Sequence, residues 1–296
     1  MASVRELLAE AHAHAPTPAG ALATANTPRR DDAQRDGEIL LCAALGQSRS
    51  YLYAWPEAQV AADVAARYRH WLDERRRGVP VAYLLGEREF WSLSLSVDES
   101  TLIPRADTER LVEVALDLAL PADAAVVDLG TGSGAIALAL ASERPGWRLT
   151  GTDISAAALA VARGNGERLQ LLNVSWLCGH WFAPLDLQRF HLIACNPPYV
   201  APDDPHLERG DLRFEPRSAL VAAQDGMADL RWLVAAAPTY LEDDGWLLLE
   251  HGWEQGPAVR ECLLRAGFVS VQSWHDLGRQ ERVSGGRWLR AAGRWP

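Results

Sequence analysis

An apolar run that ends in two prolines is the part of this sequence best suited to chemistry. Residues 190–195 read Phe-His-Leu-Ile-Ala-Cys, the pattern of a strand buried in a parallel sheet, and residues 196–199 read Asn-Pro-Pro-Tyr. The prolines end the strand because they lack an N–H and fix their own φ, and each holds the preceding residue extended. We therefore expect Asn196 to lie stiffly at the carboxyl end of a strand, where open α/β sheets bind ligands. The amide, the turn carbonyls and the aromatic ring suit a planar amide or amine; the alternative is a structural turn.

A second candidate site is a glycine-rich turn at residues 128–134, which read Asp-Leu-Gly-Thr-Gly-Ser-Gly. The turn joins a predicted strand to a predicted helix, and its glycines allow the backbone to turn tightly and to approach a ligand closely. Asp153 ends the next predicted strand, 19 positions after Gly134. An acid at this place suits the hydroxyls of a ribose.

The spacing of the glycines argues for a particular cofactor. It is Gly-x-Gly-x-Gly, whereas dinucleotide-binding folds have Gly-x-Gly-x-x-Gly. Asp128, ahead of the glycines, also suits a cationic or amine-bearing ligand better than a pyrophosphate. S-adenosylmethionine fits both features, so we predict it as the cofactor. A nicotinamide cofactor and a purely structural turn are the alternatives.

Strands and helices alternate from about residue 123, which predicts a doubly wound sheet that carries both sites. The expected strands are 124–129, 147–152, 171–177, 190–195, 246–250, 268–274 and 288–292. The expected helices between them are 136–142, 156–163, 227–241 and 257–266.

The first 82 residues have the apolar spacing of helices instead. We expect helices over 4–12, 37–45 and 57–77, with a mobile loop over 13–33. Gly78, followed by Pro80, is a usual stop signal for the last of these helices.

A hairpin is expected between the two regions, because residues 89–97 alternate apolar and polar after Trp91. We place its turn at 98–100 and its returning strand at 101–103, and we expect a helix to begin at Thr108.

These segments together resemble the PrmC/HemK family, the glutamine methyltransferases of class I peptide chain release factors. The resemblance spans about residues 35–296. Beyond the two sites it rests on Arg35-Asp36, Gly86-Glu87-Arg88-Glu89-Phe90-Trp91, Ile103-Pro104-Arg105, Asp107-Thr108-Glu109, Phe214-Glu215-Pro216, Leu249-Glu250-His251-Gly252 and Glu281-Arg282-Val283. Asn-Pro-Pro-Tyr alone is shared with methyltransferases that act on exocyclic amines of nucleic acids, and an enzyme of that class is the alternative.

The resemblance implies a class I S-adenosylmethionine-dependent methyltransferase fold, a Rossmann-like seven-stranded sheet, with a small all-α N-terminal domain and a β-hairpin linker. It implies a helical substrate-docking domain at 1–82, the linker at 83–107 and the methyltransferase domain at 108–296. The implied activity is methylation of the glutamine in the Gly-Gly-Gln motif of release factors, which modulates translation termination. A binding module that keeps a degenerate cofactor fold is the non-enzymatic alternative, and the intact glycines argue against it.

The resemblance also assigns roles to residues. The implied cofactor-binding residues are Gly130, Thr131, Gly132, Ser133, Gly134, Asp153, Trp181 and Asn196. Asn196 and the Pro197 carbonyl are the implied catalytic groups that hydrogen-bond the glutamine amide. Pro198 and Tyr199 complete the implied substrate site.

The chain departs from the family pattern at His180, where relatives usually have an acid before the tryptophan, so the resemblance supplies no polar contact to adenine at this position. No general base is assigned to Glu250, His251 or His180, because a methylated amide nitrogen becomes very acidic once it is cationic.

The composition narrows the function classes. The chain has no lysine, since all 29 basic residues are arginine, and this excludes a Schiff-base lysine and a phosphate-loop lysine. The net charge of −10 argues against a protein that grips long nucleic acid. The four cysteines, Cys42, Cys178, Cys195 and Cys262, lack metal-site spacing, so we expect reduced, mostly buried thiols and no metal.

Nothing in the sequence suggests a membrane protein, because no apolar run approaches the ~18 residues of a span and no secretory leader is visible. We expect a cytoplasmic monomer whose partners are release factors, without direct binding to nucleic acid or membrane.

Overall fold

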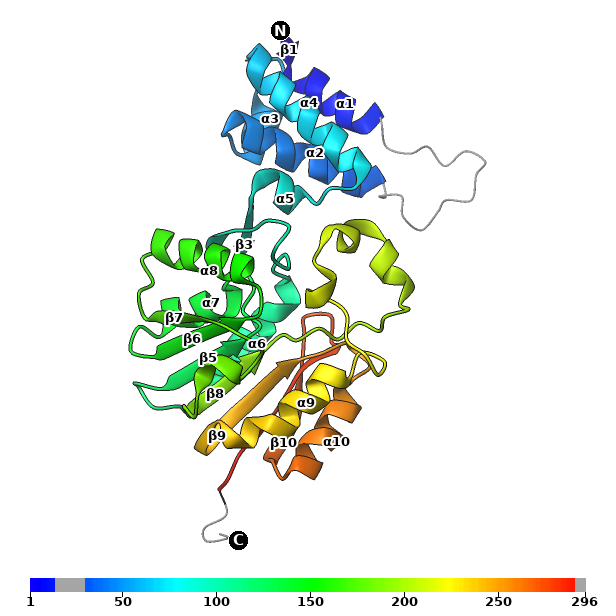
Figure 1. The fold of residues 1–296 in the computed structure, drawn as a ribbon. Coiled ribbons are helices and arrows are strands. Elements are labelled where there is room, and N and C mark those ends of the chain that lie inside the picture. Colours follow the sequence, from blue (N-terminus) through cyan, green and yellow to red (C-terminus); the bar gives the residue numbers. More distant parts are fainter. Residues whose placement is uncertain (14–29, 291–296) are drawn as a thin grey trace. The chain divides into compact units, whose positions relative to one another are not determined.

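The chain folds as two compact units in the computed structural model, which describes residues 1–13 and 30–290. The units are residues 1–86 with 205–214, and residues 87–204 with those from 215 onward (Figure 1). The domain boundaries implied after residues 82 and 107 stay predictions. Each unit has its own hydrophobic core.

The first unit is a bundle of helices around an apolar core. Its helices are α1 (Val4–Ala13), α2 (Arg30–Leu45), α3 (Arg49–Ala54), α4 (Ala62–Arg77) and α5 (Val81–Leu85), and its short turns are η3 (Pro205–Glu208) and η4 (Gly210–Phe214). Leu7, Leu40 and Tyr68 are fully buried at its centre. The Tyr68 hydroxyl donates a hydrogen bond to the Leu7 carbonyl at 3.2 Å and so joins α4 to α1.

The structure corrects two boundaries in this unit. Helix α1 ends at Ala13 and helix α2 begins at Arg30, so both ends of the loop expected over 13–33 are helical; the positions between these helices lie outside the described residues. Helix α4 begins at Ala62 rather than at residue 57, because β2 (Gln59–Val60) pairs antiparallel with β1 (Ala2–Ser3). The helix end expected at Gly78 is confirmed, and this glycine has a left-handed φ of +100°.

The second unit contains a seven-stranded sheet within the described part of the chain. Its strands are β5 (Ala125–Leu129), β6 (Arg148–Asp153), β7 (Val174–Cys178), β8 (Phe190–Cys195), β9 (Leu241–Glu250), β10 (Val269–His275) and β11 (Glu281–Arg287), in the spatial order β10-β11-β9-β8-β5-β6-β7. Strands β5 to β9 pair in parallel, and β11 runs antiparallel to both of its neighbours. The doubly wound sheet is therefore as expected.

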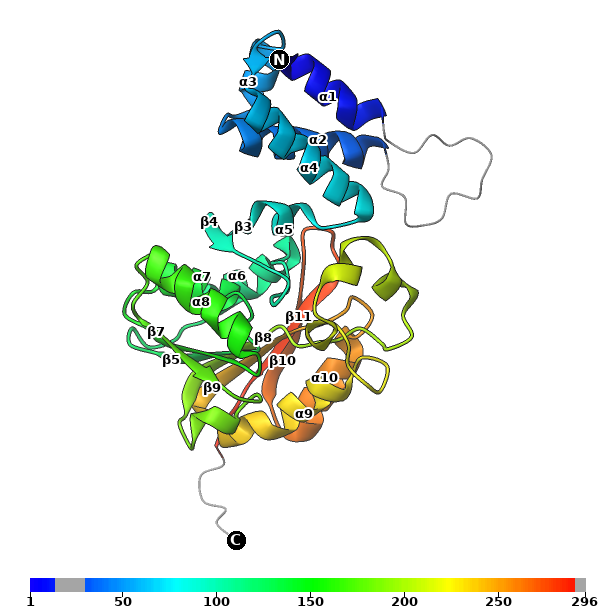
Figure 2. The same cartoon turned by 45° about the horizontal axis from the view of Figure 1, so that its top comes forward.

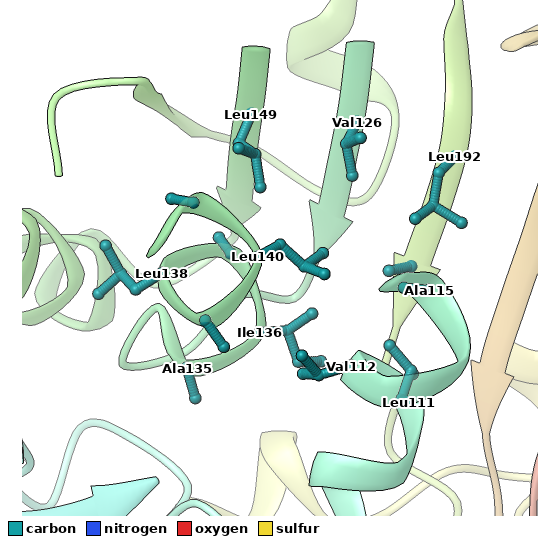
Figure 3. Packing of buried hydrophobic residues seen from close by; sticks show 14 of the residues in the cluster. Leu111, Val112, Ala115, Val126, Ala135, Ile136, Leu138, Leu140, Leu149 and Leu192 are labelled. Atoms are coloured by element: carbon teal, nitrogen blue, oxygen red, sulfur yellow. The ribbon is translucent and has the colours of Figure 1, made fainter. Parts of the chain in front are cut away.

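Helices cover both faces of the sheet. They are α6 (Glu109–Asp117), α7 (Ala135–Glu143), α8 (Ala156–Arg168), α9 (Ala228–Ala236) and α10 (Gly256–Ala266), with the 3₁₀ turns η1 (Ala106–Thr108), η2 (Ala183–Leu185), η5 (Arg217–Ala219) and η6 (Ala237–Thr239). Successive strand residues point to opposite faces, so Val126 and Leu192 pack beside α6 and α7 (Figure 3). Val127 and Ile193 belong to the other apolar cluster, which includes residues of α9 and α10. Figure 2 shows these two helices side by side.

The hairpin expected before the sheet exists, but its turn lies elsewhere. Strand β3 (Glu87–Phe90) pairs with β4 (Leu93–Ser96), so the chain reverses at Trp91 and Ser92 and not at 98–100. The two turn residues have φ of +52° and +59°, as a two-residue hairpin turn of the primed type requires. Neither is the glycine or asparagine that usually signals such a turn, which is why the sequence misplaced it. Residues 101–103 form no strand.

The last strand was also misplaced. The structure has β11 at Glu281–Arg287 where the sequence predicted a strand at 288–292, the end of which lies outside the described residues. The strand contains Gly285 and Gly286, which have low strand propensity, so the sequence pattern did not predict it. At one of them, Gly285, an added Cβ would lie 2.5 Å from Leu248 Cδ2, so the close packing against β9 explains the absence of a side chain. The helix expected over 227–241 ends at Ala236, and Leu241 already belongs to β9.

None of the described helices combines the length and the apolar character that crossing a bilayer requires. Among the cysteines, Cys195 is buried and Cys42 and Cys262 are half-buried, whereas Cys178 is exposed. The expectation of mostly buried thiols is therefore wrong for Cys178.

Candidate cofactor and substrate site

The two sequence motifs begin side by side at the carboxyl edge of the sheet. Leu129, the last residue of β5, is paired with Cys195, the last residue of β8. Gly130 and Asn196 follow these residues directly. The strand order proceeds from β5 to β6 and β7 on one side and from β8 to β9 on the other. The motifs therefore meet at the topological switch point, where doubly wound sheets bind ligands.

The glycine loop is shaped by backbone conformations that favour glycine. Gly130 has a φ of +69°, and a Cβ atom there would lie 3.1 Å from Cζ3 of Trp181. Gly134 has a φ of +85° and is the residue from which α7 starts. The N–H of Thr131 donates to the carbonyl of Thr152 at 2.8 Å and fixes the loop against β6. The loop is thus a cradle that a side chain at Gly130 would fill.

Asp128, in strand β5, hydrogen-bonds the glycine loop and the start of α7. Its Oδ2 accepts hydrogen bonds from the Thr131 hydroxyl at 2.6 Å and from the N–H of Ala137 at 3.1 Å. The carboxyl is buried, and burial raises the pKa of Asp128 to about 7, although both hydrogen bonds oppose this shift. Asp128 therefore shapes the loop and does not line the cavity beside it.

Asp153 connects three segments at the end of β6. Its Oδ2 accepts from the N–H of Gly132 at 2.9 Å, and its Oδ1 accepts from the N–H of Ser155 at 2.8 Å. Its carbonyl accepts from the N–H of Gly179 at 2.9 Å, which brings the segment after β7 to the same edge. Each carboxylate oxygen keeps further acceptor capacity.

The segment after β7 places aromatic rings at this edge. Trp181 has a φ of +49°, and its carbonyl accepts from the Thr152 hydroxyl at 3.2 Å. The ring of His180 lies 5.6 Å from that of Trp181 and 5.9 Å from that of Trp232. The indole N–H of Trp181 is buried and makes no hydrogen bond of ordinary length within the described residues.

Asp229, at the start of α9, faces the same group of rings. Burial raises the pKa of its carboxyl, and the nearby His180 and the indole N–H of Trp181 lower it. The indole N–H thus lies near this carboxylate but makes no hydrogen bond of ordinary geometry with it. Asp229 is an acceptor in the neighbourhood where His180 replaces the acid expected from the resemblance.

The Asn196 amide is oriented by its neighbours. Its Nδ2 donates to the hydroxyl of Thr108 at 3.2 Å. The donor end of the amide is therefore engaged, and Oδ1 remains as the acceptor end. The hydroxyl of Tyr199 donates to Oε1 of Glu250 at 3.2 Å, while Pro197 is buried.

These groups surround a cavity of about 360 Å³. Its walls include Gly130, Gly132, Asp153, Ile154, His180, Trp181, Asn196, Pro198, Pro216, Ser218, Val221 and Asp229. The size suits a small-molecule cofactor. The other predicted site residues lie next to the wall. Thr131, Ser133 and Pro197 are buried, Gly134 precedes α7 directly, and Tyr199 is half-buried against the apolar cluster that includes residues of α9. The roles assigned to individual residues stay predictions.

Sequence reasoning missed Asn165, which supports the glycine loop. This residue is fully buried in α8, and its amide donates to the Ser133 carbonyl at 2.9 Å. A signal was present, because Asn165 stands between two glycines inside a helix, where all three residues have poor helix propensity. Thr108 and Glu250 were likewise not recognised as partners of Asn196 and Tyr199.

Two features define a class I methyltransferase. The first is a Gly-x-Gly-x-Gly loop with an acid at the end of the adjacent strand. The second is a seven-stranded sheet that, within the described residues, has one antiparallel strand. A methyltransferase from Pyrococcus furiosus has the same fold, with a TM-score of 0.51 and 16% identity, over 77% of this chain and 98% of that chain. Family models match as well: the PrmC N-terminal domain over residues 20–86 and the methyltransferase small domain over residues 108–209.

Two relatives specify the family. The chain is 52% identical to the release factor glutamine methyltransferase of Pseudomonas aeruginosa, over 88% of this chain and 95% of that protein. It is 50% identical to the Yersinia pestis protein of the same name, over 90% of this chain and 96% of that protein. The chain belongs to the release factor glutamine methyltransferase family, which confirms the resemblance.

The residues at the cavity fit S-adenosylmethionine. Gly130 and Gly132 line the cavity directly after β5 without side chains, and Asp153 has acceptor capacity for ribose hydroxyls. Ile154 is 63% exposed beside it and offers an apolar surface to a base. Asp229 offers an acceptor for an amine.

Proposed function

We propose that this protein transfers a methyl group from S-adenosylmethionine to the side-chain amide nitrogen of a glutamine in class I peptide chain release factors. The target is the glutamine of the Gly-Gly-Gln motif that the resemblance implies, and its methylation modulates translation termination. The observation that carries the proposal is the position of Asn196 on the wall of the cavity that the glycine loop and Asp153 also line, in a chain of this family.

On the cofactor side, Gly130 to Gly134 hold the methionine part, Asp153 binds the ribose hydroxyls and Trp181 closes the pocket. When bound, S-adenosylmethionine would supply an electrophilic methyl group whose bonding electron pair stays on the sulfur. The chain's contribution is therefore position and electrostatics.

On the substrate side, Asn196 acts as a hydrogen-bond acceptor. Because its Nδ2 donates to Thr108, its Oδ1 is available for an N–H of the glutamine amide. The carbonyl of Pro197 accepts from the second N–H, and Pro198 and Tyr199 contact the side chain. These bonds orient a weakly nucleophilic nitrogen, which loses one proton after it has gained the methyl, so no strong base is needed.

The partner is a protein, and one glutamine on a loop carries too little information for specificity. We assign docking of the release factor to the helical unit. An enzyme that modifies a translation factor works as a monomer in the cytoplasm under this proposal.

The test is transfer of labelled methyl from S-adenosylmethionine to a purified release factor, with the modified residue located by mass spectrometry. The wild-type protein should label the Gly-Gly-Gln glutamine, and a release factor with asparagine at that position should stay unlabelled. Asn196→Ala should lower kcat by at least about 100-fold, because the substrate amide is no longer oriented. Cofactor affinity, measured by calorimetry, should change much less. Labelling of RNA in place of the release factor, or full transfer by Asn196→Ala, would refute the proposal.

A further inference from the structure

Four side chains from three segments meet at the Asn-Pro-Pro-Tyr turn. Asn196 Nδ2 donates to the Thr108 hydroxyl at 3.2 Å, and the Tyr199 hydroxyl donates to Glu250 Oε1 at 3.2 Å. Thr108 ends η1, and Glu250 ends β9. The Thr108 hydroxyl also lies close enough to Glu250 to lower the pKa of that carboxyl by hydrogen bonding.

The hydrogens in this group have one consistent arrangement. The oxygen of Thr108 accepts from Asn196, so its own hydrogen is free to donate. Glu250 Oε2 is buried and makes no ordinary hydrogen bond within the described residues, so it is the acceptor toward which the Thr108 hydrogen can turn. Asn196 then donates to Thr108, while the Thr108 and Tyr199 hydroxyls donate to Glu250, which is an acceptor at both oxygens when it is ionised.

This arrangement decides how the Asn196 amide faces the cavity. With Nδ2 committed to Thr108, Oδ1 is the end left for a substrate N–H. If the amide turned over, Oδ1 would accept from Thr108 and an N–H would oppose the N–H groups of the substrate. Glu250 therefore sets the direction of the Thr108 hydrogen. That direction decides whether the Asn196 amide presents its oxygen or an N–H to the substrate.

We infer that Glu250 is a positioning residue, which acts through Thr108 on Asn196 and directly on Tyr199 to keep the substrate side of the site in its accepting orientation. The inference rests on the proposed function, because it assumes that Asn196 receives an amide. Glu250 itself does not line the cavity and abstracts no proton.

The burial of Glu250 and the charges around it make the orientation of the Asn196 amide sensitive to pH. Burial raises the pKa of Glu250 to about 7; Thr108, Tyr199 and Arg282 of β11 lower it, and Asp107 of η1 raises it. Arg282 is held by Asp107 at 3.3 Å and by Asp276 of β10 at 3.1 Å.

One more carboxyl near the Asn-Pro-Pro-Tyr turn titrates in the same range: burial also raises the pKa of Asp128 to about 7, and its charge acts on Cys195 beside Asn196. The Glu250→Gln variant therefore has to assign the pH effect to Glu250. Arg105 lowers the pKa of Tyr199, but burial and Glu250 raise it further from neutrality. Burial raises the pKa of Cys195 as well. Below about pH 7 Glu250 is protonated and becomes a hydrogen-bond donor at one oxygen. It then accepts less well from Thr108 and Tyr199, so the orientation of the Asn196 amide that favours the substrate N–H is less strongly held.

The test compares Glu250→Gln, Thr108→Val and Thr108→Ser with the wild-type protein, using labelled methyl transfer to a release factor. Glu250→Gln and Thr108→Val should each lower kcat about 10- to 100-fold with little change in cofactor affinity. Thr108→Ser keeps the hydroxyl and should stay within about threefold of wild type. The double variant should lose no more than the worse single variant, because both changes break one chain of bonds.

The pH profile and a spectroscopic signal make the readout specific. Wild-type kcat should rise as pH increases through about 7, and this rise should be absent in Glu250→Gln. The side-chain amide signal of Asn196 in the ¹⁵N-labelled protein, assigned with Asn196→Ala, should shift over the same range in wild type alone. Glu242→Gln, at the other end of β9, is the matched control and should behave as wild type.

The outcomes separate the inference from the proposed function. If the wild-type protein methylates no release factor, the proposed function fails, and the amide signal still decides whether Glu250 orients Asn196. If the wild type is active and both Glu250→Gln and Thr108→Val keep its kcat and pH profile, the inference is overturned. Should Glu250→Gln fail to fold, the contrast between Thr108→Val and Thr108→Ser gives the answer.

Discussion

The side chain of Asn165 hydrogen-bonds both the backbone N–H and the backbone carbonyl of Ser96. The side-chain oxygen of Asn165 accepts from the N–H of Ser96 at 2.7 Å, and its Nδ2 donates to the carbonyl of Ser96 at 3.0 Å. The same Nδ2 donates to Ser133 in the glycine loop. One buried amide in α8 therefore ties the β3–β4 hairpin to the cofactor cradle.

Asn165→Ala should destabilise the protein by about 2–4 kcal/mol, because it removes the partner of the buried Ser133 carbonyl and of both backbone groups of Ser96. The free energy of unfolding, measured in urea, checks this value. The neighbouring Gly164→Ala is the control: an added Cβ there has nothing within 4 Å, and helix propensity favours alanine by about 1 kcal/mol. Equal stabilities for the two variants would contradict the structural role of Asn165.

Gly130→Ala should weaken S-adenosylmethionine binding at least about tenfold, because its Cβ would press on Trp181 at 3.1 Å in a left-handed conformation. Calorimetry with S-adenosylhomocysteine provides the measurement without turnover. Gly164→Ala again serves for comparison and should leave the affinity unchanged. A Gly130→Ala protein that binds as tightly as wild type would show that the loop does not closely approach the ligand.

Asp128 should make the protein less stable as pH rises. Its folded-state pKa is raised from 3.8 to about 7, so the native state retains a proton that the unfolded chain has lost. The stability contribution is fully present below pH 3.8 and is lost as pH increases to about 7, at about 1.4 kcal/mol per pKa unit. Urea titrations of wild type and Asp128→Asn at pH 4 to 8 test this: the stability of the variant relative to wild type should increase with pH across that window. A difference that stays constant would mean that Asp128 has an ordinary pKa in the folded protein.

The sequence predicted the parts of the fold that depend on strong local signals. Buried parallel strands such as β5 and β8 are continuous apolar runs, and Gly78 has a backbone conformation that only glycine adopts easily. The hairpin turn at Trp91 and Ser92 could not be predicted in this way, since non-glycine residues take left-handed conformations there. Strand β11 was missed because its glycines are selected by contact with β9 and not by strand propensity.

The same division applies to the candidate site. Gly130, Asp153 and Asn196 could be found because each follows a recognisable strand. Thr108 lies 88 positions from its partner Asn196, and Glu250 lies 51 positions from Tyr199, so neither pairing leaves a trace in local spacing. Such long-range partners require the folded chain.

The ion pair between Arg105 and Glu215 should hold one wall of the cavity in place. Arg105 Nη2 lies 2.6 Å from Glu215 Oε1, and the Glu215 side chain is fully buried. Residues 216–221, directly after Glu215, contribute Pro216, Ser218 and Val221 to the wall. Arg105→Gln removes this cation from a fully buried carboxylate, which should reduce stability by about 2 kcal/mol or more. It should also weaken cofactor binding as the wall loosens.

An exposed pair gives the matched control for this change. Arg265 and Glu261 are 78% and 61% exposed at 2.5 Å separation, so Arg265→Gln should alter stability by less than about 0.5 kcal/mol. Thermal unfolding and calorimetric titration of both variants provide the comparison. The expected result is a loss of stability and of cofactor affinity in Arg105→Gln alone. The buried Glu215 carboxylate loses a cation that offsets the cost of its desolvation, whereas the exposed Glu261 carboxylate stays solvated by water. Equal behaviour of the two variants would show that the segment after Glu215 is held by other contacts.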